Sequence, residues 1–182
     1  MNKKNKAFSL LEMVVVLFII GLILGITVPT FGPMMRTSRL KGAVQNLADA
    51  MESARQYAKT IGKQCDIVFA AGIDTSLDNK SYKIVYQPVA GTYQTVDKVI
   101  MLPKGIEIDF SNSTLPSSLL TNVPYPEDDS STYSLQHITF KPNGSSGTNG
   151  HISLYDKNTN SFQRIYFYNQ PLAVEIRDIN AL

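Results

Sequence analysis

The chain has 182 residues, with 17 basic and 15 acidic side chains, a formal net charge of +2 and a single cysteine. This length suits one globular domain beyond a terminal anchor. One cysteine excludes an intrachain disulfide, and the small net charge weighs against a general nucleic-acid-binding surface, which needs clustered lysines and arginines.

The first thirty residues contain a short basic leader followed by a long apolar segment. At about 1.5 Å per residue, residues 8–28 would form a helix of roughly 31 Å, close to the thickness of the hydrocarbon core of a bilayer. Glu12 lies four residues inside this segment. A charged side chain in a membrane helix is costly and usually functional, so Glu12 requires an explanation.

Three interpretations of this segment compete. A secretory signal peptide predicts an apolar core of about 7–15 residues and a small-residue cleavage site, whereas this core is longer and runs into Val-Pro-Thr-Phe at residues 28–31. A plain signal anchor treats Glu12 as a tolerated residue at the membrane interface. In the third interpretation the leader is removed on the cytoplasmic side and the apolar helix is retained.

The third interpretation is supported by a resemblance. The sequence AFSLLEM at residues 7–13 resembles the processing site of type IV prepilins. In that family a dedicated peptidase cuts before an aromatic residue and methylates the new amino terminus, which implies cleavage between Ala7 and Phe8. Glu12 would be the fifth mature residue, where the family keeps a glutamate, and Pro29 falls where the family commonly has a helix-bending proline. Ala7 departs from the usual glycine.

The resemblance implies that Glu12 acts in assembly. Cleavage would leave a cationic amine on Phe8, and in the family the glutamate of one subunit neutralises the amine of a neighbour. Opposite charges attract strongly in a low dielectric, while either one alone is penalised, so the pair would set the register between subunits. An intrachain pair is the alternative, because Phe8 and Glu12 are four residues apart on one helix face.

The lysines of the leader predict the orientation and change the charge balance. Lys3, Lys4 and Lys6 precede the apolar segment, so the N-terminus is expected in the cytoplasm and residues after Pro29 outside it. The predicted location is the inner membrane, with a single span and a periplasmic or extracytoplasmic C-terminal domain. Removing the three lysines leaves 14 basic and 15 acidic residues, a net charge of −1.

Residues 30–62 predict a helix that continues the membrane segment, with a disturbance near Pro29, Gly32 and Pro33. Gly62 is a plausible C-cap. The apolar and small residues recur at spacings of three and four and form one stripe, which comprises Leu40, Ala43, Val44, Leu47, Ala48, Met51, Ala54, Ala58 and Ile61.

After Gly62 the pattern changes to the period of two that is typical of strands. The predicted strands are residues 66–70, 82–87, 98–102, 107–110, 138–141, 151–155, 162–167 and 173–176. Residues 156–160, DKNTN, predict a hairpin turn, and residues 111–133 predict a long surface loop because they contain three prolines and a polar run. Cys65 begins an apolar run and is predicted to be buried.

The second half of the chain resembles the GspH/FimT-type minor pseudopilins. Residues 47–69 are similar to the helix-to-strand passage of that family, and residues 137–156 are similar to its later strand, glycine-rich loop and strand. The resemblance implies an α+β, pilin-like fold, in which a long N-terminal helix packs on a mostly antiparallel β-sheet head. The expected parts are a leader (1–7), a membrane and filament-core helix (8–28), an amphipathic continuation (29–62) and a β-rich head (63–182).

Catalytic and metal-binding interpretations find little support. The two histidines, His137 and His151, border predicted strands, and no cluster has zinc-ligand spacing. The glycine-rich run 144–150 lacks the Lys-Ser/Thr of a phosphate-binding loop. The acidic residues at 74–78 and 127–129 hint at calcium, but a complete calcium loop is missing at 74–78 and a solvated loop is favoured at 127–129. No enzyme activity, cofactor or small-molecule substrate is predicted.

The resemblance implies a minor pseudopilin, a structural subunit of a type II secretion pseudopilus in protein export. The alternative within the family is a minor type IV pilin involved in pilus assembly or DNA uptake, and the net charge of −1 counts against DNA as a partner. An anchored enzyme or carbohydrate-binding module is the alternative from another class. The implied partners are the prepilin peptidase, other pilins or pseudopilins in a filament, and the inner membrane.

Overall fold

The computed structural model describes residues 9–73, 76–125, 132–147, 149–169 and 174–178, without the side chains of residues 26–37, 174, 175 and 178. The chain divides into two compact units, Met1–Thr37 and Ser38–Leu182. The secondary structure combines one long helix with ten strands among the described residues, so the predicted α+β class is confirmed.

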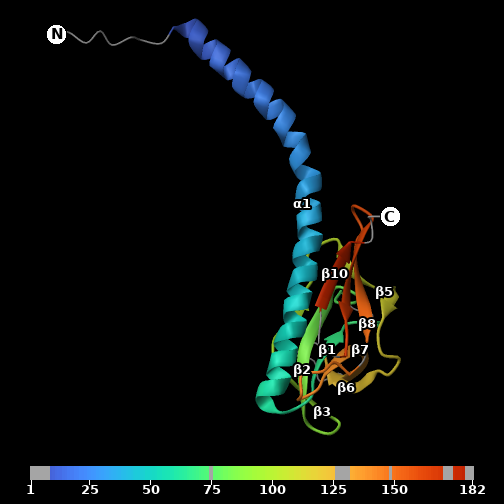
Figure 1. Ribbon diagram of the computed structural model, residues 1–182. Helices are drawn as coiled ribbons and strands as arrows, with labels where there is room; N and C mark the ends of the chain where they lie inside the picture. Colours follow the sequence, from blue (N-terminus) through green and yellow to red (C-terminus); the bar gives the residue numbers. More distant parts are fainter. Residues whose placement is uncertain (1–8, 74–75, 126–131, 148, 170–173, 179–182) are drawn as a thin grey trace, which may run out of the picture. The chain divides into compact units, whose positions relative to one another are not determined.

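Helix α1 extends over Leu10–Ile61 (Figure 1). It ends at Gly62, whose φ of 64° is a left-handed conformation that glycine adopts readily, so the predicted C-cap is confirmed. The helix continues through Pro29 and Pro33. Among the described residues, no helix is both long and apolar enough to cross a membrane. The predicted span over 8–28 is therefore not shown, and Phe8 and the side chains of 26–28 lie outside the described part.

The part of α1 that belongs to the second unit buries the predicted apolar stripe. Eight of its nine residues are at most 7% exposed, and Ile61 is partly buried. Polar residues between them, such as Lys41, Gln45 and Asp49, are exposed. The helix is thus stabilised in the head by one continuous apolar face, as the spacing predicts.

Five strands form a larger antiparallel sheet in the order β3-β2-β1-β7-β6, and a sixth, β4, also pairs with β2. Their bounds are Cys65–Phe69 for β1, Ser81–Val89 for β2, Thr92–Thr95 for β3, Ile100–Met101 for β4, Leu120–Pro124 for β6 and Thr132–Phe140 for β7. The central strand β1 pairs with β2 and β7, for example Ile67 with Ile84 and Ile138. The edge strands β3 and β6 contact each other, so the sheet curls.

A smaller antiparallel sheet has the order β10-β9-β8-β5. Its strands are Ile106–Thr114 for β5, Gly150–Asp156 for β8, Ser161–Phe167 for β9 and Val174–Asp178 for β10. Strands β8 and β9 form a hairpin across residues 157–160, where Asn160 has a φ of 54°, so the predicted DKNTN turn is confirmed.

Two apolar cores organise the second unit. The first lies between α1, one face of the larger sheet and one face of the smaller sheet, and contains Leu47, Met51, Phe69, Phe140 and Ile165. The second lies on the other face of the larger sheet and contains Val68, Val85, Val123, Tyr125 and Leu135.

The second core shows where the strand predictions fail. Residues 111–133, predicted as a surface loop, contain the end of β5, all of β6 and the start of β7 among their described members. Val123 and Tyr125 are fully buried there. The loop prediction was wrong because Pro124 lies at the end of β6, where it pairs with Thr132 at the sheet edge and a missing N–H is tolerated. Strand β3, with the polar sequence TYQT, was not predicted.

Candidate functional site

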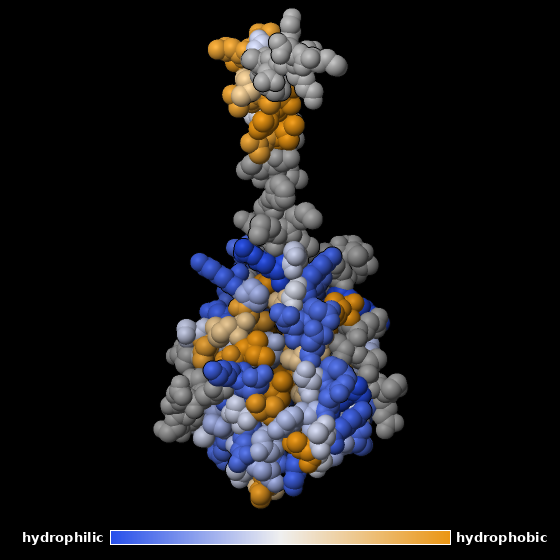
Figure 2. Space-filling model, turned by 90° about the vertical axis from the view of Figure 1, so that its left-hand side faces the viewer, coloured by the Kyte–Doolittle hydropathy of each residue, from blue (hydrophilic) through white to orange (hydrophobic). Residues whose placement is uncertain are grey.

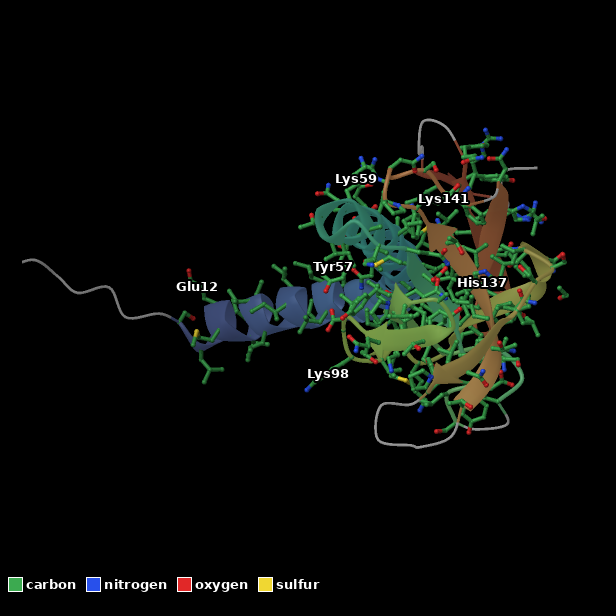
Figure 3. All side chains as sticks on the ribbon, turned by 90° about the horizontal axis from the view of Figure 1, so that it is seen from below. Glu12, Tyr57, Lys59, Lys98, His137 and Lys141 are labelled. Atoms are coloured by element: carbon green, nitrogen blue, oxygen red, sulfur yellow. The ribbon has the colours of Figure 1, made fainter. Side chains whose placement is uncertain are left out.

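The first turn of α1 carries the one acidic residue of the apolar segment. The carbonyl of Ser9 accepts hydrogen bonds from the Glu12 and Met13 amides, at 3.0 and 3.3 Å, which places Ser9 at the start of the helix. Glu12 is exposed and projects from the helix (Figure 3). A carboxylate in the first turn is favoured by the positive end of the helix dipole, so Glu12 is compatible with the helix even before it has a partner.

The apolar side chains around Glu12 are uncovered within the first unit. From Leu10 to Leu24, the large hydrophobic residues are between 46% and 83% exposed. Because they follow one another along the helix, they point to all of its sides, and Figure 2 shows the apolar surface on the side that faces the viewer. A helix that is apolar all round is expected to be buried by lipid or by other chains. The sequence and geometry therefore indicate a segment that requires an apolar environment.

Three of the predicted site residues cannot be placed with their side chains. Ala7 and Phe8, the predicted cleavage position, lie outside the described residues, as does the side chain of Pro29. The assembly role of Glu12, the cleavage and the bend at Pro29 all remain predictions.

The predicted core residues outside α1 are placed by the structure. Cys65 is fully buried, as predicted, and burial raises the pKa of its thiol to about 12. His137 lies in β7 and is 6% exposed, and burial lowers its pKa. The Nε2 atom of His151, in β8, lies 3.0 Å from the Asn112 carbonyl oxygen. Both histidines are parts of strands, and neither borders a group of candidate metal ligands among the described residues.

The candidate calcium residues are only partly described. Asp74 and residues 127–129 lie outside the described part of the chain. The Asp78 carboxylate accepts a hydrogen bond from the Gly72 amide at 2.8 Å, so it closes a turn. At the start of the glycine-rich run, the Lys141 amide donates to the Ser145 carbonyl at 2.9 Å and the Gly144 amide donates to the Lys141 carbonyl at 2.8 Å, so residues 141–145 form a tight turn.

Two groups of residues, one polar and one largely aromatic, were missed because they are brought together only by the pairing of strands. The first is a set of buried polar side chains, Asp66, Lys83 and His137, on the face of the larger sheet that bears the second core. In the strand register Lys83 and His137 both pair with Val68, one from each side. The Lys83 ammonium donates to the Pro124 carbonyl at 3.3 Å and lies 5.9 Å from the centre of the Tyr125 ring.

The second group lies on the outer face of the smaller sheet. Tyr155 and Phe162 are paired across β8 and β9 and stack with ring centres 4.5 Å apart. His151 and Tyr166 form a second cross-strand pair at 5.2 Å. Because these rings pack on one another, they do not lie flat side by side as a platform for sugar stacking would require. The outer face therefore gives the carbohydrate-binding alternative no support.

Comparison with known proteins identifies the N-terminal segment. Residues 2–28 match the family model of the prokaryotic N-terminal methylation motif. No curated protein and no solved structure matches the chain significantly. The matched motif supports a type IV prepilin-like protein, and it is typical of structural pilin-like proteins, which are not enzymes. It also suggests processing by a prepilin peptidase and anchoring in the inner membrane.

Proposed function

We propose that this protein is a minor pseudopilin, a structural subunit of a type II secretion pseudopilus that takes part in protein export. The observation that carries the proposal is the methylation motif over residues 2–28, which contains the basic leader, Phe8 and Glu12. In this role the chain is structural and catalyses no reaction. It is cut between Ala7 and Phe8, stored in the inner membrane and extracted into a filament.

The uncovered apolar helix supports a part in a filament core. Residues 8–28 cross the membrane before assembly, and the same side chains pack against neighbouring subunits afterwards. The GspH/FimT-type resemblance of residues 47–69 and 137–156 favours a minor subunit, whose head contacts other minor subunits. The alternative, a minor type IV pilin in pilus assembly or DNA uptake, rests on the same motif.

Intact mass spectrometry of the membrane-extracted protein tests the processing step. We expect a chain that starts at methylated Phe8. A chain that starts at Met1 in a host with an active prepilin peptidase, or one cut after residue 28, contradicts the proposal. An Ala7→Gly variant, which restores the usual residue of the family, serves as the control and is expected to give the same mature mass.

The role of Glu12 is tested by Glu12→Ala and by the isosteric Glu12→Gln. We expect both variants to insert into the membrane and to be processed, but to enter filaments poorly, because the Phe8 amine of a neighbour loses its partner. Met13→Ala, which changes the next exposed residue without a change of charge, is the matched control. Normal incorporation of Glu12→Ala would refute the assembly role.

Deletion of the gene distinguishes the two filament systems. For a pseudopilin we expect exported proteins to accumulate in the periplasm while surface pili remain. Loss of pili or of DNA uptake with normal secretion favours the type IV pilin alternative. Both phenotypes should be complemented by the wild-type chain and not by Glu12→Ala.

A further inference from the structure

Residues 143–150 contain two Asn-Gly sequences, at 143–144 and at 149–150. An asparagine that precedes glycine is prone to lose its side-chain amide, because glycine has no Cβ to hinder the approach of its backbone nitrogen to the asparagine Cγ atom. Whether this reaction occurs in a folded chain depends on the local hydrogen bonds and on the freedom of the backbone. The two sequences differ in both respects.

Asn143 lies in the exposed turn 141–145, and its side-chain oxygen is held by two donors. The Ser145 amide and the Ser145 hydroxyl donate to Asn143 Oδ1 at 3.0 and 2.8 Å. Both hydrogen bonds strengthen when negative charge develops on that oxygen. Two fixed donors at the oxygen of a carbonyl under attack form the arrangement that stabilises oxyanions in enzymes. The turn is thus preorganised for attack on the Cγ atom of Asn143.

The nucleophile within reach in this turn is the Gly144 backbone nitrogen. Its N–H donates to the Lys141 carbonyl at 2.8 Å, and this hydrogen bond must open before the attack. The Lys59 side chain covers the glycine, since a Cβ on Gly144 would lie 2.8 Å from the Lys59 Nζ atom. An ammonium group at this position favours the negative charge that the nitrogen carries after it loses its proton.

The second Asn-Gly sequence is held by the smaller sheet. Gly150 is the first residue of β8 and pairs with Phe167 of β9. A Cβ on Gly150 would overlap with the Thr114 carbonyl oxygen, so the backbone is closely packed here. The Asn149 side-chain oxygen accepts a hydrogen bond from the Asn169 amide. Attack by the Gly150 nitrogen would require β8 to leave the sheet, which costs more than opening a turn.

We propose that the turn 141–145 promotes the deamidation of its own Asn143, while Asn149 is protected. The Gly144 nitrogen loses its proton to a solvent base and attacks Cγ. A C–N bond forms, the Cγ–Nδ2 bond breaks, and the amide nitrogen takes up a proton and leaves as ammonia. Water then opens the cyclic imide, the ring nitrogen regains a proton, and an aspartate or isoaspartate carboxylate remains. The net change is the exchange of ammonia for water.

The turn accommodates the aspartate product. A carboxylate at position 143 retains both Ser145 donors, and hydrogen bonds of this kind stabilise the charged form. Lys59 and Lys141 lie on the same side of the head (Figure 3), so the new negative charge arises near two lysines. Isoaspartate instead adds a methylene to the backbone and disturbs the hydrogen bonds across the turn. The modification therefore changes the charge, and in part the shape, of this side of the head.

The experiment incubates the full chain in detergent at mildly alkaline pH and physiological temperature. Peptide mapping by mass spectrometry follows the products at both asparagines, and the released ammonia is measured in the same samples. In the folded chain we expect Asn143 to react faster than Asn149 by about tenfold or more, because a paired strand opens less often than a turn. In denaturant the two rates should become similar, since both asparagines precede glycine.

Two substitutions test the groups around the reacting atoms. Ser145→Ala removes the hydroxyl donor and should slow the reaction of Asn143 by about twofold to tenfold in the folded chain, with no comparable effect in denaturant. Lys59→Ala should slow it as well, whereas Lys59→Arg keeps the charge and should retain the rate. Lys98→Ala, at an exposed lysine on the other side of the head (Figure 3), is the matched control and should react as the wild type does.

Equal rates at Asn143 and Asn149 in the folded chain, or a rate at Asn143 that Ser145→Ala leaves unchanged, would overturn the inference. A variant that has unfolded is recognised because its Asn149 reacts as fast as in denaturant, and Lys59→Ala then decides. Asn143→Gln, whose longer side chain closes an imide ring far more slowly, should release less ammonia than the wild type. None of these measurements depends on leader cleavage or on filament assembly, so their outcome is independent of the proposed function.

Discussion

Thr139 in β7 donates a hydrogen bond of 2.5 Å to the carboxylate of Asp66 in β1, and the two residues are register partners at the centre of the larger sheet. Gln64 donates to the same carboxylate at 3.1 Å. These donors favour the charged form, but burial is the larger effect and raises the pKa of Asp66 to about 6. A buried acid at the middle of a sheet therefore couples the stability of the head to pH.

The first prediction concerns this coupling. The pKa of Asp66 in the folded chain is about 6, above the ordinary aspartate value of 3.8, so the folded state binds the proton more tightly than the unfolded state does. The resulting stabilisation is fully present below pH 4 and is lost as pH rises through 6. The shift corresponds to about 3 kcal/mol. We expect the free energy of unfolding of the wild type to fall by that amount relative to Asp66→Asn between pH 4 and 7. Parallel curves in denaturant titrations would contradict this.

His137 should give the opposite dependence. Burial lowers its pKa below the usual 6.5, so the neutral imidazole is favoured in the folded chain and stability is lost as pH falls below 6.5. Its Nδ1 atom has no hydrogen-bond partner in the described residues. In an Asp66→Asn background, His137→Leu is expected to remove the remaining loss of unfolding free energy between pH 6.5 and 5. His151→Leu, at a less buried histidine, is the comparison variant.

Substitution by alanine should have opposite effects on stability at Gly144 and at Gly42. Gly144 has a φ of 79°, and a Cβ there would overlap with the Lys59 side chain. We expect Gly144→Ala to destabilise the head by about 1–3 kcal/mol because alanine is strained at this φ, and Gly144→Ala/Lys59→Ala to recover little of the loss, because the end of the flexible Lys59 side chain can move aside. Gly42 lies inside α1 with no atoms near the position of a Cβ, so Gly42→Ala should stabilise the chain by about 0.5–1 kcal/mol. Thermal unfolding of the four chains measures both effects.

The second core can be tested by truncating leucines. Leu135 is fully buried in that core, and Leu135→Ala is expected to cost about 2–5 kcal/mol of unfolding free energy. Leu119, in the segment predicted as a loop, is 45% exposed, and Leu119→Ala should change the free energy by less than about 0.5 kcal/mol. Equal effects of the two variants would mean that β6 and β7 do not enclose a core.

The parts of the fold that were predictable depend on local pattern. The stripe from Leu40 to Ala58 and the C-cap at Gly62 follow from spacing along one helix, and the hairpin at 156–160 follows from turn residues between two apolar runs. Strands β3 and β6 were missed because TYQT and LTNVP contain few apolar residues. Each is an edge strand that is stabilised by pairing with a neighbour, β3 with β2 and β6 with β7. The sequence of either segment alone does not indicate that pairing.

The candidate sites also differ in whether local sequence or strand pairing reveals them. Glu12 was identifiable because one carboxylate in an apolar run is unusual whatever the tertiary structure. The Asn-Gly sequence at residues 143–144 is also visible in the chain, but Lys59 lies beside Gly144 only in the folded structure. The buried position of Asp66 likewise depends on its pairing with Val85 and Thr139.

The placement of β1 between β2 and β7 affects how the chain matures. Phe69 pairs with Gln136 and Cys65 with Phe140, so the middle of the larger sheet is completed only by residues far downstream. Pairings of this kind form slowly, because a long loop must close first. During synthesis the apolar stripe on α1 is made before the strands that cover it. The head therefore passes through a folding stage with an uncovered, aggregation-prone helix, so a delay in the appearance of the downstream strands would lower the yield of folded protein.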